Sequence, residues 1–83
     1  MILLIYADNC RDCERMKSFI DIALKEQGKD IDVKIINSDT DEAIDVAIEN
    51  GIEDIPGCVI GECVMYGKKG FNYELIYNAI REI

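Results

Sequence analysis

The chain has 83 residues, of which 49% are hydrophobic, and its 17 Asp and Glu against nine Lys and Arg give a formal net charge of −8. This length predicts a single domain, residues 1–83, with room for one layer of sheet and a few helices. The negative charge argues against a nucleic-acid partner, because phosphate backbones would be repelled.

The opening segment Met1–Ala7 is apolar, but it is too short to span a membrane and has no basic flank. We therefore expect no membrane contact and no secretory signal. The default compartment is then the reducing cytoplasm, where a C-x-x-C pair is more often redox-active or metal-binding than a permanent bridge.

The first two elements are a strand and a helix. Residues Ile2–Ala7 form an unbroken hydrophobic run, typical of a strand in the middle of a sheet. A helix is predicted from Asp12 to about Gln27, with Gly28 placed to end it. Its apolar positions are Met16, Phe19, Ile20, Ala23 and Leu24.

A second strand and a second helix follow. Residues Ile31–Asn37 are rich in β-branched side chains, and the helix before them predicts a strand parallel to the first. The next helix begins with a capping side chain at Ser38 or Thr40 and stops at Gly51. Its apolar side consists of Ala43, Ile44, Ala47 and Ile48.

The remaining elements are a hairpin and a third helix. Residues Cys58–Tyr66 read as two short antiparallel strands around a turn at Gly61-Glu62. Asn72 can cap the last helix, whose apolar face consists of Leu75, Ile76, Ala79, Ile80 and Ile83. The predicted fold class is α/β, in the order βαβαββα, with a four-stranded mixed sheet sandwiched by helices.

Cys10 and Cys13 form a C-x-x-C pair at the junction of the first strand and the first helix. Cys10 should lie just ahead of the helix, where the unpaired amides and the positive helix end favour a thiolate. Arg11 should help, and three nearby acids should oppose it, so we expect the pKa of Cys10 to be lowered only modestly. Those acids are Asp8, Asp12 and Glu14. Cys10 is then the nucleophile, and Cys13 is the resolving thiol.

The other two cysteines, Cys58 and Cys63, should lie diagonally on one sheet face at roughly 7–8 Å, too far apart for an unstrained bridge. We interpret them as small core residues. An alternative is that all four cysteines hold a zinc or iron ion, although C-x4-C across a turn is an unusual spacing for a structural site. Our expectation is that the protein needs no metal or other cofactor.

Three stretches of the chain resemble the thioredoxin family: "YADNCRDC" (Tyr6–Cys13), "VKIINSD" (Val33–Asp39) and "NGIEDIPG" (Asn50–Gly57). In length, the chain is more similar to glutaredoxins and to small glutaredoxin-like thioredoxins. The resemblance implies a thioredoxin-like fold with sheet order 2-1-3-4 and three helices. It also implies a thiol–disulfide oxidoreductase that acts on disulfide-containing proteins.

The resemblance also assigns roles around the cysteines. Pro56 would be the cis-proline of the family, and the backbone of Ile55 would pair with an extended substrate. The rim of the site would be formed by Tyr6, Asn9, Arg11 and Gly67. The electron donor would be a thioredoxin reductase or glutathione, and the protein would be a monomer. A non-catalytic thioredoxin-like binding module is a further alternative.

The sequence departs from the family at several positions. Arg11 and Asp12 replace the Gly-Pro between the cysteines, so a strongly reducing potential does not follow from the resemblance. Leu4 and Ile35 stand where thioredoxins keep a buried acid and a lysine. Gly67 is followed by Lys68 and Lys69 instead of the second glycine and the acid with which glutaredoxins hold glutathione.

Overall fold

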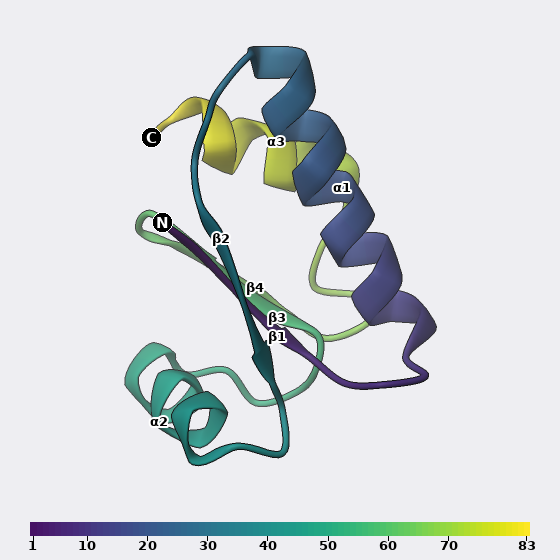
Figure 1. Ribbon diagram of the computed structural model, residues 1–83, viewed down its shortest axis with the longest axis vertical. Helices are drawn as coiled ribbons and strands as arrows, with labels where there is room; N and C mark the ends of the chain where they lie inside the picture. Colours follow the sequence, from purple (N-terminus) through teal and green to yellow (C-terminus); the bar gives the residue numbers. More distant parts are fainter.

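Seven elements follow one another along the chain in the computed structural model, which describes residues 1–83. They are β1 (Ile2–Tyr6), α1 (Arg11–Gln27), β2 (Val33–Asn37), α2 (Asp41–Asn50), β3 (Gly57–Ile60), β4 (Cys63–Tyr66) and α3 (Tyr73–Arg81). The sheet has the order β2-β1-β3-β4, so the predicted element order and strand order are both confirmed. Helices α1 and α3 cover one face of the sheet, and α2 lies against the other (Figure 1).

Strand β1 is central and fixes which loops meet at each end of the sheet. It runs parallel to β2 and antiparallel to β3, so Ile5 pairs with Ile36 on one side and with Gly57 on the other. The loop that leaves β1 and the segment that enters β3 therefore lie at the same end of the sheet. Figure 1 shows both at the end of the molecule that also holds α2.

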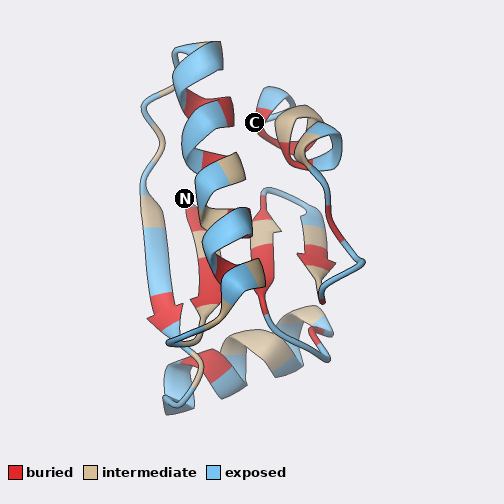
Figure 2. Cartoon of the chain, turned by 90° about the vertical axis from the view of Figure 1, so that its right-hand side faces the viewer, coloured by how far each residue is buried: buried red, intermediate tan, exposed pale blue.

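The sheet has a core on each face, because β1 alternates its side chains between them. The face covered by two helices has the larger core. Ile2 and Leu4 belong to the main core, together with residues of α1 and α3. Figure 2 shows buried segments on the strands and on both of these helices. The other members of the main core are Met16, Ile20, Ala23, Leu24, Cys58, Ile60, Met65, Phe71, Ile76, Ala79 and Ile80. The smaller core beneath α2 consists of Ile5, Ile36, Ala43 and Ile52.

The residues that the sequence offers as helix caps and stops act as such in the structure. Gly28 terminates α1 with φ 62°, a left-handed conformation that glycine adopts without steric cost. Thr40 rather than Ser38 caps α2, since its hydroxyl accepts the Ala43 amide at 3.2 Å. The side-chain oxygen of Asn72 caps α3 in the same way.

Two predicted strands are shorter than expected, and one helix is longer. The first strand ends at Tyr6 instead of Ala7, and the second begins at Val33 instead of Ile31. Helix α1 begins one residue earlier than predicted, at Arg11, because Cys10 is its capping residue. Differences of one or two residues are usual at element ends, where the hydrogen-bond pattern is incomplete.

The apolar faces predicted for α2 and α3 are only partly buried. On α2, Ile44 is 53% exposed and Ile48 is 75% exposed, because this short helix buries only Ala43 completely against one end of the sheet. On α3, Leu75 lies on the solvent side, and Ile83 follows the end of the helix. None of the helices has both the length and the apolar character that a membrane crossing requires.

Candidate active site

Cys10 and Cys13 form a disulfide at the N-terminus of α1, with 5.2 Å between their Cα atoms. The amide of Cys13 donates a hydrogen bond to Sγ of Cys10 at 3.2 Å, so a cysteine sulfur fills the role of the usual capping oxygen. Cys13 is completely buried, whereas Cys10 is half-buried. Of the two sulfurs, that of Cys10 is therefore the one a second molecule can approach.

The charges around Cys10 are partly compensated within the site. Arg15 forms an ion pair with Asp12 at 3.0 Å, and the Tyr6 hydroxyl donates a hydrogen bond to the carboxylate of Glu14. Arg11 is exposed and is not in an ion pair. Of the two acids in the first turn, Asp12 is therefore neutralised by a counter-ion. Glu14 has a hydrogen-bond partner but no counter-ion.

Two further predicted rim residues shape the approach to Cys10. Asn9 has φ 57°, a left-handed conformation in which the chain turns from β1 into α1. Tyr6, at the end of β1, is half-buried, and its bond to Glu14 joins this strand to the first turn of α1. Asn9 itself is exposed.

The Ile55-Pro56 peptide bond is cis, as the resemblance implies. Pro56 is fully buried and directly precedes Gly57, the partner of Ile5 in the sheet, so it lies at the end of β1 from which the chain continues to Cys10. Ile55 is 39% exposed. Its amide donates a hydrogen bond to Oδ1 of Asp54 at 2.8 Å.

Gly67 lies beside this segment, as its amide donates to the carbonyl of Pro56 at 2.9 Å. It is buried and has φ 81°, which favours glycine. The loop that follows carries the exposed Lys68 and Lys69 and closes with a hydrogen bond from the Gly70 amide to the Gly67 carbonyl. With Asp54 and Tyr66, residues 67–70 surround an open cavity of about 360 Å³.

The strand register thus places the predicted site residues at one end of the sheet, the end at which β1 leads to the disulfide and Pro56 leads into β3. Sequence reasoning missed Asp54, which holds the Ile55 amide and lines the cavity beside Gly67. It also treated Glu14 only as a nearby charge and did not predict that its carboxylate accepts a hydrogen bond from the Tyr6 hydroxyl. An acid directly before Ile-Pro was the available signal for Asp54, because an Asp side chain readily accepts from a nearby backbone amide.

The remaining cysteines differ from each other. Cys58 is buried in the main core, as predicted, and burial raises the pKa of its thiol to about 12. The prediction that Cys63 is also a core residue was wrong, since Cys63 begins the edge strand β4 and is exposed. No three His, Cys, Asp or Glu side chains are grouped so as to hold a metal ion, and the four cysteines do not converge. This geometry speaks against the four-cysteine alternative.

Comparisons with known proteins agree with the fold. A family model described as Thioredoxin matches residues 1–72. Among solved structures, the glutaredoxin-like protein NrdH-redoxin from Escherichia coli, whose title refers to its thioredoxin-like activity profile, has 23% sequence identity and a TM-score of 0.65. The match covers 93% of this chain and 91% of that one.

A second solved structure has the same fold. The thioredoxin-like protein BC3987 is 20% identical, with a TM-score of 0.67 and coverage of 95% of this chain and 99% of that one. A search of the curated proteins gave no significant match.

Proposed function

The chain belongs to the thioredoxin family, and from this we propose that it is a thiol–disulfide oxidoreductase that exchanges the Cys10–Cys13 couple with disulfide-containing proteins. The observation that carries the proposal is the unequal burial of the two sulfurs at a helix N-terminus. Cys10 is half-buried and caps α1, and Cys13 is completely buried one turn further on. The first sulfur can react with another molecule, and the second can react only with the first.

The reaction proceeds in two exchange steps. The Cys10 thiolate attacks one sulfur of a substrate disulfide, which forms a mixed disulfide and releases the other substrate sulfur as a thiolate. The Cys13 thiolate then attacks Sγ of Cys10, which forms the Cys10–Cys13 disulfide and releases the second substrate thiolate. Two electrons pass from the protein to the substrate, and the released thiolates take up the protons that the cysteines lose.

The proton of Cys13 has no buried acceptor in the fold. Leu4 is completely buried where thioredoxins place an acid, Ile35 is exposed, and no polar or charged residue of the chain is buried. The substrate thiolate released in the first step is then the base at hand for Cys13, with water as the alternative. We expect resolution of the mixed disulfide to be slow relative to its formation.

The substrate segment lies along Ile55 and Pro56 in this proposal and pairs with the backbone of Ile55. Tyr6, Asn9, Arg11 and Gly67 form the rim. Support comes from the shared end of the sheet on which these residues lie and from the exposure of Ile55. The thioredoxin-like activity profile named for the Escherichia coli NrdH-redoxin is in keeping with the proposed reaction.

We place the protein in a reducing compartment such as the cytoplasm, as a monomer that receives electrons from a thioredoxin reductase or from glutathione. The exposed pair Lys68 and Lys69 beside Gly67 can attract a carboxylate, which keeps glutathione as a candidate donor. Reduction of the purified disulfide by NADPH with a thioredoxin reductase, compared with reduction by glutathione, distinguishes the two donors.

The proposed function is tested by insulin reduction driven by dithiothreitol. We expect the parent protein and Cys63→Ser to accelerate the reaction equally and Cys10→Ser to fall to the rate of dithiothreitol alone. Cys13→Ser should instead accumulate a mixed disulfide with insulin, visible as a heavier band without reductant. Equal rates for parent and Cys10→Ser would overturn the proposal and favour the non-catalytic binding module.

A further inference from the structure

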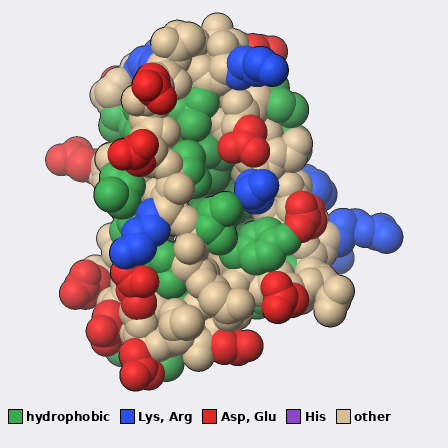
Figure 3. Space-filling model, in the orientation of Figure 1, with side chains coloured by type: hydrophobic (Ala, Val, Ile, Leu, Met, Phe, Trp, Pro, Cys, Tyr) green, Lys and Arg blue, Asp and Glu red, His purple; other side chains and the backbone are tan.

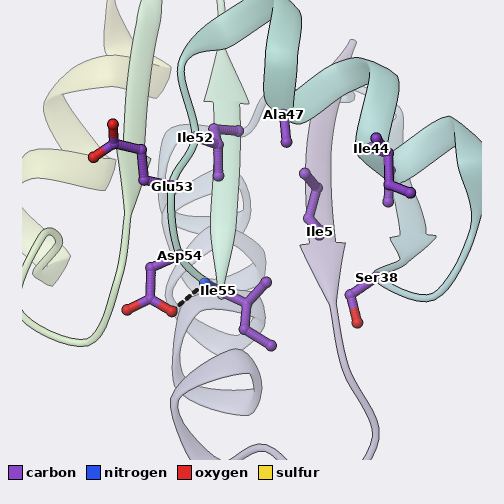
Figure 4. Close-up of a pocket in the computed structure, with 9 residues that line it drawn as sticks. Ile5, Ser38, Ile44, Ala47, Ile52, Glu53, Asp54 and Ile55 are labelled. Carbon is purple, nitrogen blue, oxygen red and sulfur yellow. Dashed lines mark hydrogen bonds between the residues drawn. The ribbon is translucent and has the colours of Figure 1, made fainter.

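A second cavity lies between α2 and the segment that leads to Pro56. Its volume is about 200 Å³, and most of its lining is apolar. Figure 4 shows Ile44 and Ala47 pointing down from α2 toward Ile5 and Ile52. Ile55 closes the lower side, so the cavity and the proposed docking segment share a residue. We name this cavity the α2 pocket.

Two of the large apolar side chains that line the α2 pocket are exposed to solvent. Ile44 and Ile55 both line it, and both are more than one third exposed. An engineered apolar cavity of about 150 Å³ is large enough to bind benzene, so the α2 pocket can hold one large apolar side chain. Burial of that side chain would cover apolar surface that the chain alone leaves in contact with water.

The rim of the α2 pocket is negatively charged. Glu53 and Asp54 line it, and neither is among the ion pairs of the structure, which join Arg15 to Asp12 and Lys34 to Glu42. Acidic side chains gather on the end of the molecule that holds α2 (Figure 3). Lys68 and Lys69 line the other cavity, which Asp54 also borders, but neither lysine forms an ion pair with Asp54. The complementary ligand is therefore an apolar side chain with a cation beside it.

We propose that the α2 pocket selects substrates: it takes a large apolar side chain of the disulfide-containing segment, while Asp54 binds a Lys or Arg next to it. This inference rests on the proposed function and names its substrate class. The pocket is continuous with that site through Ile55.

Asp54 links the two parts of this recognition. Its carboxylate accepts the Ile55 amide at 2.8 Å, the same amide that an extended substrate would use. A substrate cation that draws the carboxylate away frees the Ile55 amide for the substrate carbonyl. A substrate without a cation must compete with Asp54 for that amide. The cation of the substrate therefore affects both the affinity and the backbone pairing with Ile55.

The test uses short peptides with one cysteine held as a mixed disulfide with 2-nitro-5-thiobenzoate, whose release is followed by absorbance. One position carries Leu or Ala and its neighbour carries Arg or Glu, and this pair is moved residue by residue along both sides of the cysteine. The same mixed disulfide of 2-mercaptoethanol has neither feature and serves as the reference. The measured quantity is the second-order rate constant of the reduced protein.

At the matching position, we expect Leu to react roughly tenfold faster than Ala, as for side chains that differ in apolar size. Arg should react about 1.4- to 5-fold faster than Glu, the range for an exposed charge pair. Asp54→Asn keeps an oxygen for the Ile55 amide and should remove only the Arg preference. Ala47→Leu fills the cavity and should remove only the Leu preference. Glu62→Gln, at the hairpin turn at the opposite end of β3, is the matched control and should retain both.

Equal rates for all peptides at every position, with the reference reduced normally, would overturn the pocket and leave the proposed function intact. Persistence of the Arg preference in Asp54→Asn, or of the Leu preference in Ala47→Leu, would also overturn it. Failure to reduce both the peptides and the reference would overturn the proposed function and this inference with it. A normal reference rate in each variant shows that the variant is folded.

Discussion

The backbone amide of Cys13 points at Sγ of Cys10 across 3.2 Å, at the first turn of α1. After reduction, the same donor and the positive end of the helix stabilise a Cys10 thiolate. Against this stands Glu14, whose charge lies on the same turn without a counter-ion. The reactivity of Cys10 is thus a balance between the amide donor and a nearby acid.

Replacement of Glu14 by Gln should increase the reactivity of reduced Cys10. The charge is lost, while an oxygen remains to accept from the Tyr6 hydroxyl. An exposed charge contributes about 0.2–1 kcal/mol, so we expect about 1.4- to 5-fold faster alkylation by iodoacetamide at pH 7. The measurement uses a Cys63→Ser background, because the exposed Cys63 also reacts.

Glu62→Gln is the control for this prediction, since Glu62 is an exposed acid in the β3–β4 turn, at the opposite end of the sheet from Cys10. Its alkylation rate should equal that of the Cys63→Ser parent. An unchanged rate in Glu14→Gln would mean that the acid does not influence the sulfur. Addition of salt should reduce the difference, as screening weakens interactions between exposed charges.

The second prediction concerns Cys58 and alkaline pH. Burial raises the pKa of its thiol from 9.0 to about 12, so between these values the unfolded chain has lost a proton that the folded chain retains. Stability must then fall as pH rises through this window, by up to about 1.4 kcal/mol per pH unit from this group. Urea unfolding at pH 8.5 and pH 10.5 measures the fall.

Other groups titrate in the same window, so the comparison must be between variants. Burial and the Glu26 carboxylate raise the pKa of Tyr73, which adds a fall of the same sign. Cys58→Val removes only the thiol, and its stability should fall less between the two pH values than that of the parent. Cys63→Ser should fall as much as the parent. Parallel curves for the parent and Cys58→Val would contradict the assignment.

The sequence predicts the fold well where a single physical signal dominates. The apolar run of β1, the caps Thr40 and Asn72, and the stop at Gly28 each have a local cause that the surrounding chain does not override. The proximity of the C-x-x-C pair likewise has a local cause, because a spacing of three positions at the start of a helix brings the Cα atoms of Cys10 and Cys13 to 5.2 Å. The expectation of a cis peptide bond before Pro56 came from the family resemblance and not from any local pattern.

The errors occur where burial depends on how much of a face is covered. Periodicity identifies the apolar side of α2, but it does not show that this short helix leaves Ile44 and Ile48 exposed. Cys63 shares a face with Cys58, yet it lies on the edge strand and meets solvent. Asp54 was missed because its role depends on the peptide geometry at Ile55 and on a loop 13 residues further on.

The third prediction concerns the loop after β4. A Cβ atom on Gly70 would lie 1.8 Å from the backbone oxygen of Tyr66, so Gly70→Ala must displace the loop that carries Gly67. We expect it to lower the free energy of unfolding by more than about 2 kcal/mol, with slower insulin reduction, since the rim of the site moves with the loop.

Gly28→Ala is the matched control for Gly70. Gly28 has φ +62° but no atom within 4 Å of an added Cβ, so its cost is that of the left-handed conformation alone, about 1–2 kcal/mol. This variant should keep the parent rate of insulin reduction after correction for the folded fraction. A Gly70→Ala protein with parent stability and rate would show that the loop moves aside at no cost.

The last prediction compares two isoleucines that the sequence pattern does not distinguish. Both Ile76 on α3 and Ile48 on α2 belong to the apolar face predicted for their helices, but Ile76 is completely buried and Ile48 is 75% exposed.

Ile76→Val removes one buried methyl group and should cost about 0.5–1.5 kcal/mol. Ile48→Val should change stability by less than about 0.5 kcal/mol, since surface substitutions usually do. Because Ile and Val are both β-branched with similar helix propensity, the difference between the two urea transitions reports burial alone. Equal losses would mean that α2 is covered in solution by a second molecule, whereas a neutral Ile76→Val would contradict the packing of α3 against α1.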